Sequence, residues 1–495
     1  MGRYLLGIDN GGTVAKAALF DSAGHELACH GSRVPTAAAP HGWAERDAQA
    51  LWLASAEAVR GVLAKAQVDP HAVTAVACTG HGNGLYLTDE QGHPTRPGIY
   101  STDSRAQAIV DRWLADGVDR AARPLTRQGL WAGQPNALLA WLAEHEPETL
   151  ARSRWALMCK DYLRLRLTGQ AGAELTDWSG TSLLNVVSRE FDPRVLALFG
   201  LTDIEQLLPP LLRCDQVAGT VTAEAAAATG LAEGTLVAGG LFDIDACSLA
   251  AGLTDQHHIS LAAGTWGCNQ SLCREPLDDP GLFMASCYAI DGWYLLLEGS
   301  PTSAGNLDWF LREWMPDGPS DDAYELASRL VGSVDPRDSE VIFLPYLYGS
   351  GPVAGVKGAL LGLEAGHTRA HVLRAVYEGV AFAHWQHIQR LLTFGPRPDS
   401  VRCTGGAARS AVWMQMFADV FGLSVEVPAG SELGALGAAI TAAVAAGLHA
   451  DLPSAVAAMT RMERRYEPDP ALTSVYAARC ARSQAAADAL RACNA

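Results

Sequence analysis

The sequence lacks the short motifs of several common enzyme classes. It contains no G-x-x-x-x-G-K-[ST], which excludes a P-loop enzyme. It also contains no G-x-S-x-G, no H-E-x-x-H and no G-x-G-x-x-G after the first apolar segment. These absences argue against α/β-hydrolases, zinc proteases and dinucleotide-binding enzymes. Lysine is scarce, with only Lys16, Lys65, Lys160 and Lys357 among 37 basic residues.

The eleven cysteines form no C-x-x-C pair, and no His pair joins them at the spacing of a zinc site. We expect them to be small buried residues that stay reduced. Long hydrophobic runs are missing too. The most apolar late stretch, 433–448, is mostly Ala and Gly and too short to cross a bilayer, so it is predicted to be a buried helix. The N-terminus resembles no signal peptide, and we expect a cytoplasmic location.

Length and charge limit the number of domains and the kinds of partner to expect. A chain of 495 residues is too long for one ordinary core and predicts at least two domains. With 49% hydrophobic and 18% charged residues, the composition is that of a globular protein. The formal net charge of -17 disfavours nucleic acid and anionic membrane as partners. A nucleotide is still allowed, because backbone amides and Mg²⁺ act locally.

Two segments share a pattern in which an extended stretch leads into a glycine-rich turn. The first turn follows residues 4–9 and spans Asn10–Thr13, and the second follows 258–262 and spans Ala263–Gly267. Glycines in such turns let the backbone approach a ligand closely. Two turns that face each other are able to hold the phosphates of one nucleotide. The alternative is two ordinary hairpins in a large α/β protein.

The rest of the chain alternates between the two kinds of secondary structure. Helices are predicted at 48–65, 371–392 and 411–421, and strands at 73–77, 341–346 and 400–403. This alternation predicts α/β layers. We place one domain boundary after the Asp243 segment, which gives domains of 1–245 and 246–495.

The first turn carries the residue types that phosphate and magnesium require. The backbone amides of Gly11 and Gly12 and the hydroxyl of Thr13 are donors for phosphate oxygens. Asp9 offers Mg²⁺ a hard oxygen ligand, directly or through water. Lys16 is placed to pair with a phosphate.

Longer segments make the chain resemble the FGGY family of carbohydrate kinases. The stretch Gly358–Leu363, followed after seven residues by His371–Glu378, fits the C-terminal signature of that family at every constrained position. Within the family the resemblance is to the xylulose kinases, in particular those of the L-xylulose type. The segments that carry it are Gly42–Asp47, Pro124–Gln128, Glu144–Glu148, Lys160–Arg164, Gly239–Asp243, Gly264–Trp266, Pro301–Asn306 and Val412–Met416.

The resemblance implies a fold and a set of roles. The fold is α/β, with two actin- and hexokinase-like (ribonuclease H-like) ATPase domains and a cleft between them. The N-terminal domain binds the sugar and carries the first phosphate turn, and the C-terminal domain binds the nucleotide. ATP and Mg²⁺ are the implied cofactors. Asp243 is the implied general base, accepting the proton of the hydroxyl that receives the phosphoryl group, and with Asp9 it is an implied magnesium ligand.

The implied binding residues fall into two sets. Those for the nucleotide are Gly11, Gly12, Thr13, Lys16, Gly264, Thr265, Gly305, Gly406, Ala407 and Ser410, and those for the sugar are His81, Gly82, Asn83, Asp103, Asp243 and Asp245. Asp245 enters because Ile244 stands where the family has Asn or Gln after the base. His81–Asn83 replaces the Gln-Met-His of D-xylulose kinases, which predicts a different sugar preference. The structural alternatives are a core histidine at His81 and a helix cap at Asp103.

We therefore expect an ATP-dependent kinase acting on a pentulose, with L-xylulose before D-xylulose. Ribulose, erythritol or another small polyol is the alternative substrate. An actin- or chaperone-like ATPase acting on protein partners shares the two turns but not the polyol loop. An inactive sugar-binding regulator would lack Asp9, Thr13, Thr265 or Asp243, and all four are present. A small sugar is the expected partner, with a homodimer as a family-level expectation.

Overall fold

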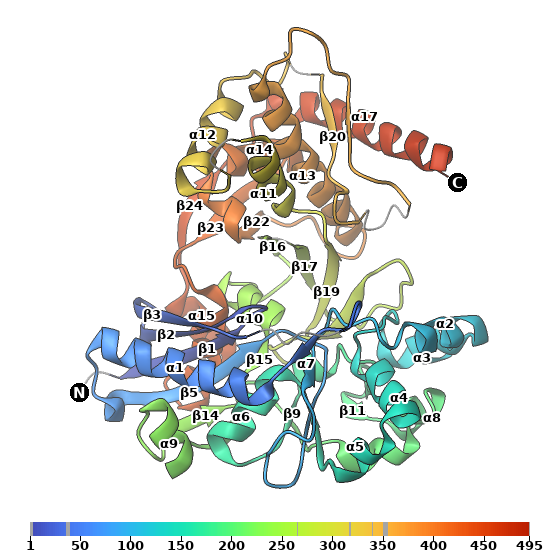
Figure 1. Cartoon of the computed structure of the whole chain (residues 1–495). Coiled ribbons are helices and arrows are strands. Elements are labelled where there is room, and N and C mark those ends of the chain that lie inside the picture. Colours follow the sequence, from blue (N-terminus) through green and yellow to red (C-terminus); the bar gives the residue numbers. More distant parts are fainter. Residues whose placement is uncertain are drawn as a thin grey trace. The chain divides into compact units, whose positions relative to one another are not determined.

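The computed structural model describes residues 3–35, 40–264, 266–315, 318–338, 340–349 and 355–494. The chain forms two compact units, each a layered α/β structure (Figure 1). The first comprises Met1–Thr254, Arg274–Leu295 and Gly430–Thr460, and the second comprises Asp255–Cys273, Leu296–Ala429 and Arg461–Ala495. The predicted two-domain α/β class is confirmed. The units do not follow a single cut after residue 245, because a late segment returns to the first unit.

The main sheet of the first unit runs in the order β13-β14-β5-β1-β2-β3, and β15 also pairs with β5. Its strands are β1 (Tyr4–Asn10), β2 (Val14–Asp21), β3 (Glu26–Arg33), β5 (Val73–Gly80), β13 (Val217–Thr220), β14 (Leu236–Ala238) and β15 (Leu241–Phe242). The expected hairpin at the N-terminus and the strand at 73–77 are confirmed as β1, β2 and β5.

The two faces of β1 meet different helices. Leu6 and Ile8 belong to a buried cluster with α1 (Ala48–Ala66) and α6 (Cys159–Thr168). Gly7, which points to the other face, meets α15 (Leu433–Ala445), because a Cβ there would lie 1.9 Å from the carbonyl oxygen of Ala435. The predicted buried helix at 433–448 is therefore confirmed, and it packs directly on the strand backbone.

Helix α1 confirms the prediction at 48–65, and its ends follow ordinary capping chemistry. The Asp47 carboxylate accepts hydrogen bonds from the amides of Gln49 and Ala50. The helix stops where Gln67 adopts the left-handed conformation, with a φ of 53°.

A second core of the first unit lies among short helices and strands between residues 85 and 211. Its elements are β6 (Tyr86–Thr88), β7 (Gly98–Ile99), α2 (Gln107–Asp116), α3 (Val118–Thr126), α4 (Pro135–His145), α5 (Pro147–Arg152), β8 (Trp155–Leu157), β9 (Ala173–Glu174), α7 (Leu175–Trp178), β10 (Leu184–Asn185), β11 (Glu190–Phe191), α8 (Pro193–Leu198) and β12 (Leu211–Leu212). The remaining elements of this unit are β4 (Glu45–Arg46), α9 (Ala223–Thr229), α10 (Asp243–Ala250), β18 (Met284–Cys287) and α16 (Leu452–Met459).

The sheet of the second unit runs β19-β17-β16-β22-β23-β24. Its strands are β16 (His258–Ala263), β17 (Gly267–Cys273), β19 (Tyr294–Ser300), β22 (Ser400–Thr404), β23 (Ser424–Pro428) and β24 (Met462–Tyr466). Around it lie α11 (Gly305–Trp314), α12 (Asp321–Gly332), β20 (Ile342–Leu344), β21 (Ala359–Leu361), α13 (Arg369–Leu391), α14 (Ala411–Phe421) and α17 (Pro470–Asn494). The predictions at 341–346, 371–392, 400–403 and 411–421 are confirmed.

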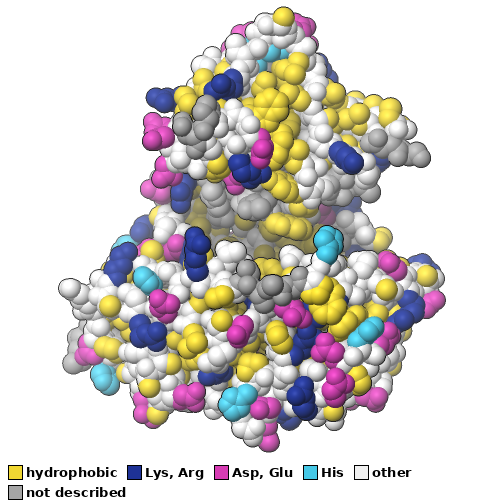
Figure 2. Space-filling model, viewed as in Figure 1, with side chains coloured by type: hydrophobic (Ala, Val, Ile, Leu, Met, Phe, Trp, Pro, Cys, Tyr) yellow, Lys and Arg dark blue, Asp and Glu magenta, His cyan; other side chains and the backbone are white. Residues whose placement is uncertain are grey.

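Acidic and basic side chains are interspersed on the visible face of each unit (Figure 2). The negative net charge of the chain therefore forms no single large acidic patch on that face. Within the described ranges, no helix has both the length and the apolar character needed to cross a bilayer.

Candidate active site

Three strands of the first unit end side by side, and candidate residues follow each of them. In the register of the sheet, Asn10 at the end of β1 pairs with Gly80 at the end of β5, and Gly80 pairs with Phe242 at the end of β15. The carboxyl ends of parallel strands are a common place for ligands. The structure therefore brings together, at one edge, the first turn after Asn10, the loop beginning at His81 and the predicted base Asp243.

Asp243 is the first residue of α10 and is half-buried. Burial raises the pKa of its carboxyl well above the usual range, and the negative charges of Asp9 and Asp177 raise it further. The three carboxylates thus share one region. A carboxyl with a raised pKa is a stronger proton acceptor once ionised, as a general base requires.

Asp9 lies on β1 next to the N-terminus of α15. A Cβ at Gly434 would be 2.4 Å from Oδ2 of Asp9, so only glycine allows this approach without a shift. Burial raises the pKa of Asp9 to about 6, against the opposing charge of Lys16. The ammonium of Lys16 is itself bound by Glu432, with Nζ–Oε2 and Nζ–Oε1 distances of 3.0 and 3.2 Å. Lys16 therefore already has a carboxylate partner.

The first turn is open. Gly12 and Thr13 are exposed, and a Cβ at Gly11 would meet no atom within 4 Å. A Cβ at Gly12 would lie 3.2 Å from the hydroxyl of Tyr100. Tyr100 is thus a neighbour of the turn, which the sequence did not suggest.

The predicted sugar loop is buried and carries polar atoms without partners. His81 is 5% exposed and its Nε2 lies 3.1 Å from the hydroxyl of Tyr86, whereas Nδ1 has no partner among the described residues. Burial, followed by the charge of Arg46, lowers the pKa of His81 to about 3, so this imidazole is neutral at physiological pH. Oδ1 of Asn83 is likewise buried with no partner in the described chain. Gly82 is required by space, because a Cβ would be 2.1 Å from the ring of Phe242.

The two remaining sugar candidates are more enclosed. Asp103 accepts hydrogen bonds from the Ala44 amide at 2.6 Å and from the Arg105 amide, Nε and Nη2 at 2.8 to 2.9 Å. Its carboxylate therefore holds the surrounding loops together. Asp245 is fully buried on α10, where burial and then the charge of Glu174 raise its pKa well above the usual range.

A buried ionic cluster lies near Asp243, and sequence reasoning had assigned it no function. The Lys160 ammonium lies 3.0 Å from Asp161, 3.3 Å from Glu174 and 3.2 Å from Asp177, and all four side chains are fully buried. Thr176 links the cluster to the backbone next to Asp243. Its hydroxyl donates to Glu174 at 2.7 Å and accepts the amide of Phe242, the residue before Asp243, at 3.0 Å.

Two members of the cluster have pKa values well above their usual ranges. Burial raises the pKa of Asp177 to about 7, although Lys160 opposes the shift. Burial by itself would lower the pKa of Lys160, but the adjacent carboxylates outweigh it and hold the pKa above its usual value.

In the second unit the glycine turns meet at another strand edge. Strands β16 and β22 are parallel, with Ala262 paired to Thr404, so Gly264 and Gly406 follow neighbouring strand ends. Gly405 has a φ of 88°, and a Cβ there would lie 2.7 Å from the carbonyl oxygen of Ala263. This turn therefore requires glycine for both conformation and space.

The other nucleotide candidates contribute in different ways. Gly305 is buried at the start of α11, and the methyl of Ala407 lies in the core. The Ser410 hydroxyl caps α14 by accepting the amide of Trp413 at 3.3 Å, and it lies 3.0 Å from the hydroxyl of Ser328. Thr265 lies outside the described residues.

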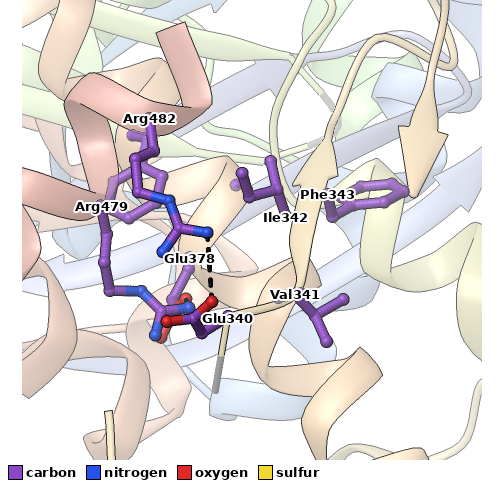
Figure 3. A pocket seen from close by; sticks show the side chains of 10 residues that line it. Glu340, Val341, Ile342, Phe343, Glu378, Arg479 and Arg482 are labelled. Atoms are coloured by element: carbon purple, nitrogen blue, oxygen red, sulfur yellow. Dashed lines mark hydrogen bonds and ion pairs between the residues drawn. The ribbon is translucent and has the colours of Figure 1, made fainter. Parts of the chain in front are cut away.

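The C-terminal signature segment has a structural part in the second unit. The carboxylate of Glu378 on α13 pairs with Arg374 at 2.9 Å and also with Arg479 of α17. Figure 3 shows Glu378 and Arg479 beside a pocket that is also lined by Glu340 and Arg482. These contacts fasten the C-terminal helix to the unit.

Comparison with known proteins identifies the family of the chain. Residues 4–250 match the N-terminal domain, and residues 259–446 the C-terminal domain, of the FGGY family of carbohydrate kinases. A probable L-xylulose kinase of Pasteurella multocida is 39% identical over 490 residues, covering 99% of both chains. The L-xylulose/3-keto-L-gulonate kinase of Escherichia coli is 38% identical over 96% of this chain and 95% of its own.

Solved structures of related proteins extend the comparison. The crystal structure of a xyloylose kinase from Brucella ovis matches with a TM-score of 0.88 and 28% identity, covering 99% of this chain and 100% of that one. Xylulose kinase from Rhodospirillum rubrum gives the same TM-score and identity, with 99% of both chains covered. The chain described here belongs to the FGGY family of carbohydrate kinases and is a phosphotransferase that acts on a small sugar.

Proposed function

We propose that this kinase transfers the γ-phosphoryl group of ATP to a hydroxyl of a pentulose, with L-xylulose as the first candidate and D-xylulose as the second. The observation that supports the proposal most is the shared strand edge of the first unit. There a carboxylate, an open glycine turn and buried polar atoms without partners occur together. A polyol needs such donors and acceptors beside the base. The names of the relatives point to xylulose.

In this proposal Asp243 accepts the proton of the attacking hydroxyl. Nδ1 of His81 and Oδ1 of Asn83 bind sugar hydroxyls, and the backbone of Gly82 lines the same pocket. Asp103 supports this pocket through its bonds to Arg105 and Ala44. Asp245, which is fully buried on α10, is also a proposed sugar-binding residue.

The phosphates of ATP would be held by backbone amides and the Thr13 hydroxyl of the first turn, with Lys16 at its side. In the second unit Gly264 and Thr265 are the proposed phosphate contacts. Gly305, Gly406 and Ser410 are proposed to line the adenosine pocket, with Ala407 as a further nucleotide contact. Glycine-lined turns suit this task because amides approach phosphate oxygens without a side chain between them. An actin-like ATPase would share these turns but would have no use for the polyol pocket.

Asp9 and Asp243 are the proposed residues for Mg²⁺. They fit the ion in kind, since both are hard oxygen ligands, and the buried carboxyl of Asp9 gains from a cation nearby. Among the described residues no group of three or more His, Cys, Asp or Glu side chains is arranged to hold a metal. Phosphate oxygens and water are the other ligands proposed for the ion. When bound, the ion neutralises charge on the phosphates.

The decisive experiment uses Asp243→Ala. Its rate of sugar phosphorylation should fall by about three orders of magnitude or more, because base and positioning are lost together. A coupled assay with ATP and L-xylulose, D-xylulose, ribulose or erythritol measures this, with ATP binding and thermal unfolding as controls for folding. Full activity of a folded variant would refute the assignment of the base. ATP consumption that is independent of any sugar would refute the kinase.

Location and assembly are further proposals. Buried thiols at Cys78, Cys159, Cys214, Cys287 and Cys403 are free, which suits the reducing cytoplasm, where ATP is also supplied. We expect a homodimer, and sedimentation of the purified chain tests it.

A further inference from the structure

Arg46 differs from the arginines around it in having no carboxylate partner among the described residues. Arg46 is only 5% exposed, and its Nη1 has no hydrogen-bond acceptor in the part of the chain that the structure describes. Arg96 and Arg105, by contrast, share the carboxylate of Glu45 at 2.5 and 2.8 Å, and Arg105 also binds Asp103 at 2.8 Å. One buried guanidinium of the three is therefore left without a counter-charge.

The short strand β4 explains this difference. Glu45 and Arg46 are consecutive residues of β4, which pairs with β7, so their side chains point to opposite faces. Glu45 turns toward its two arginines. Arg46 points to the opposite face, where its Cζ lies 4.4 Å from the ring centre of Tyr100.

The face that Arg46 reaches is the proposed sugar pocket. The ring centres of Tyr100 and His81 lie 4.2 Å apart, so the guanidinium over Tyr100 is also close to the buried imidazole, whose Nδ1 has no partner among the described residues. Burial, and then the charge of Arg46, lower the pKa of His81. The Tyr100 hydroxyl borders Gly12 of the first turn, and the charge of Asp243 also acts on it. Arg46 therefore lies within the set of groups that would surround a bound sugar.

A buried charge without a partner is expensive, and such a group is kept where a ligand supplies the missing charge. A guanidinium matches a carboxylate better than a hydroxyl, because two parallel charge-assisted hydrogen bonds form. Building on the kinase activity proposed above, we propose that Arg46 binds the substrate directly and favours a ketose that carries a carboxylate, a keto-aldonate, over a neutral ketose. Arg46 is then a specificity-determining residue that discriminates between negatively charged and neutral sugars.

The test compares Arg46→Gln with the wild type on 3-keto-L-gulonate and on L-xylulose, with ATP saturating. A hydrogen bond to a charged group accounts for roughly 10- to 100-fold in binding. We expect kcat/KM for the acid to fall by a factor in that range, and kcat/KM for the neutral sugar to change by less than about threefold. Arg112→Gln, on the surface of α2, serves as the matched control and should change neither. Equal losses for both sugars, no loss for either, or no acceptance of the acid by the wild type would overturn the proposal.

Two further measurements distinguish this proposal from a purely structural role of Arg46 and from a failure of the kinase assignment. Without ligand, Arg46→Met should unfold at the same temperature as the wild type or higher, because an unpaired buried charge is removed. Arg105→Met should unfold at a lower temperature, because Asp103 and Glu45 lose their partner. A drop for Arg46→Met as large as that for Arg105→Met would mean a structural arginine and refute the proposal. Calorimetric binding of the acid without ATP tests Arg46 even if the kinase assignment fails.

Discussion

The two strand edges that carry the candidate residues differ in what lines them, which is side chains in the first unit and backbone in the second. In the first unit the edge is lined by polar side chains, and several of their atoms, at Arg46, His81 and Asn83, have no partner in the described chain. In the second unit the edge is made of backbone, with Gly405 held at a positive φ, while the side chains of Ala407 and Ser410 are engaged in the core and in a helix cap. The contrast suggests that sugar preference changes with side chains, whereas nucleotide binding depends on main-chain geometry.

The largest effect on this comparison is expected from Lys160→Met. The substitution leaves Asp161, Glu174 and Asp177 buried without their shared cation, which should cost about 3–5 kcal/mol in free energy of unfolding. Because Thr176 joins Glu174 to the amide before Asp243, the proposed base, kcat should fall by a larger factor than the affinity for ATP. Urea unfolding and steady-state kinetics measure both quantities. Lys65→Met, at an exposed position, is the control. An unchanged free energy of unfolding for Lys160→Met would contradict the inference that buried side chains stabilise the strand edge of the first unit.

A smaller effect should come from Gly405→Ala in the second unit. The new Cβ would be strained by the φ of 88° and would press on the carbonyl of Ala263, at a cost of about 1–3 kcal/mol. ATP should bind more weakly while binding of the sugar alone stays as in the wild type, and calorimetry with each ligand checks this. Gly406→Ala sharpens the test, because a Cβ there meets no atom within 4 Å and should not alter stability. An equal loss of stability in both variants would count against the role of the turn.

The smallest effect is expected from Ser410→Ala. Losing this N-cap should lower the free energy of unfolding by about 1 kcal/mol. The KM for ATP should change by less than about threefold if the hydroxyl serves only the helix. Thermal unfolding measures the change in stability, and an ATP titration measures the KM. A tenfold or larger rise in KM would place the hydroxyl on the nucleotide and weaken the contrast between the two edges.

The glycine turns and Asp243 were accessible from the sequence because their signals are local. A turn after a strand, or a carboxylate after a Gly-Gly pair, is visible within about ten residues. Non-local relations were not accessible. The sequence could not reveal that Arg105 saturates Asp103, that Arg46 is left unpaired, or that Tyr100 borders Gly12, because side-chain partners depend on how β4 and β7 pair. The same holds for the approach of Gly434 to Asp9, since more than 400 residues separate them in the sequence.

The packing of α15 against β1 has a consequence for how the protein is made. The first unit includes residues Gly430–Thr460, and Gly7 lies against Ala435. During synthesis, most of the first unit leaves the ribosome long before this helix does. The core of the unit therefore stays open on one face until translation is nearly complete, although domains generally fold from the N-terminus as they emerge. A nascent chain arrested before residue 430 should expose that face to chaperones and proteases, so the first unit is finished by one of the last parts of the chain to appear.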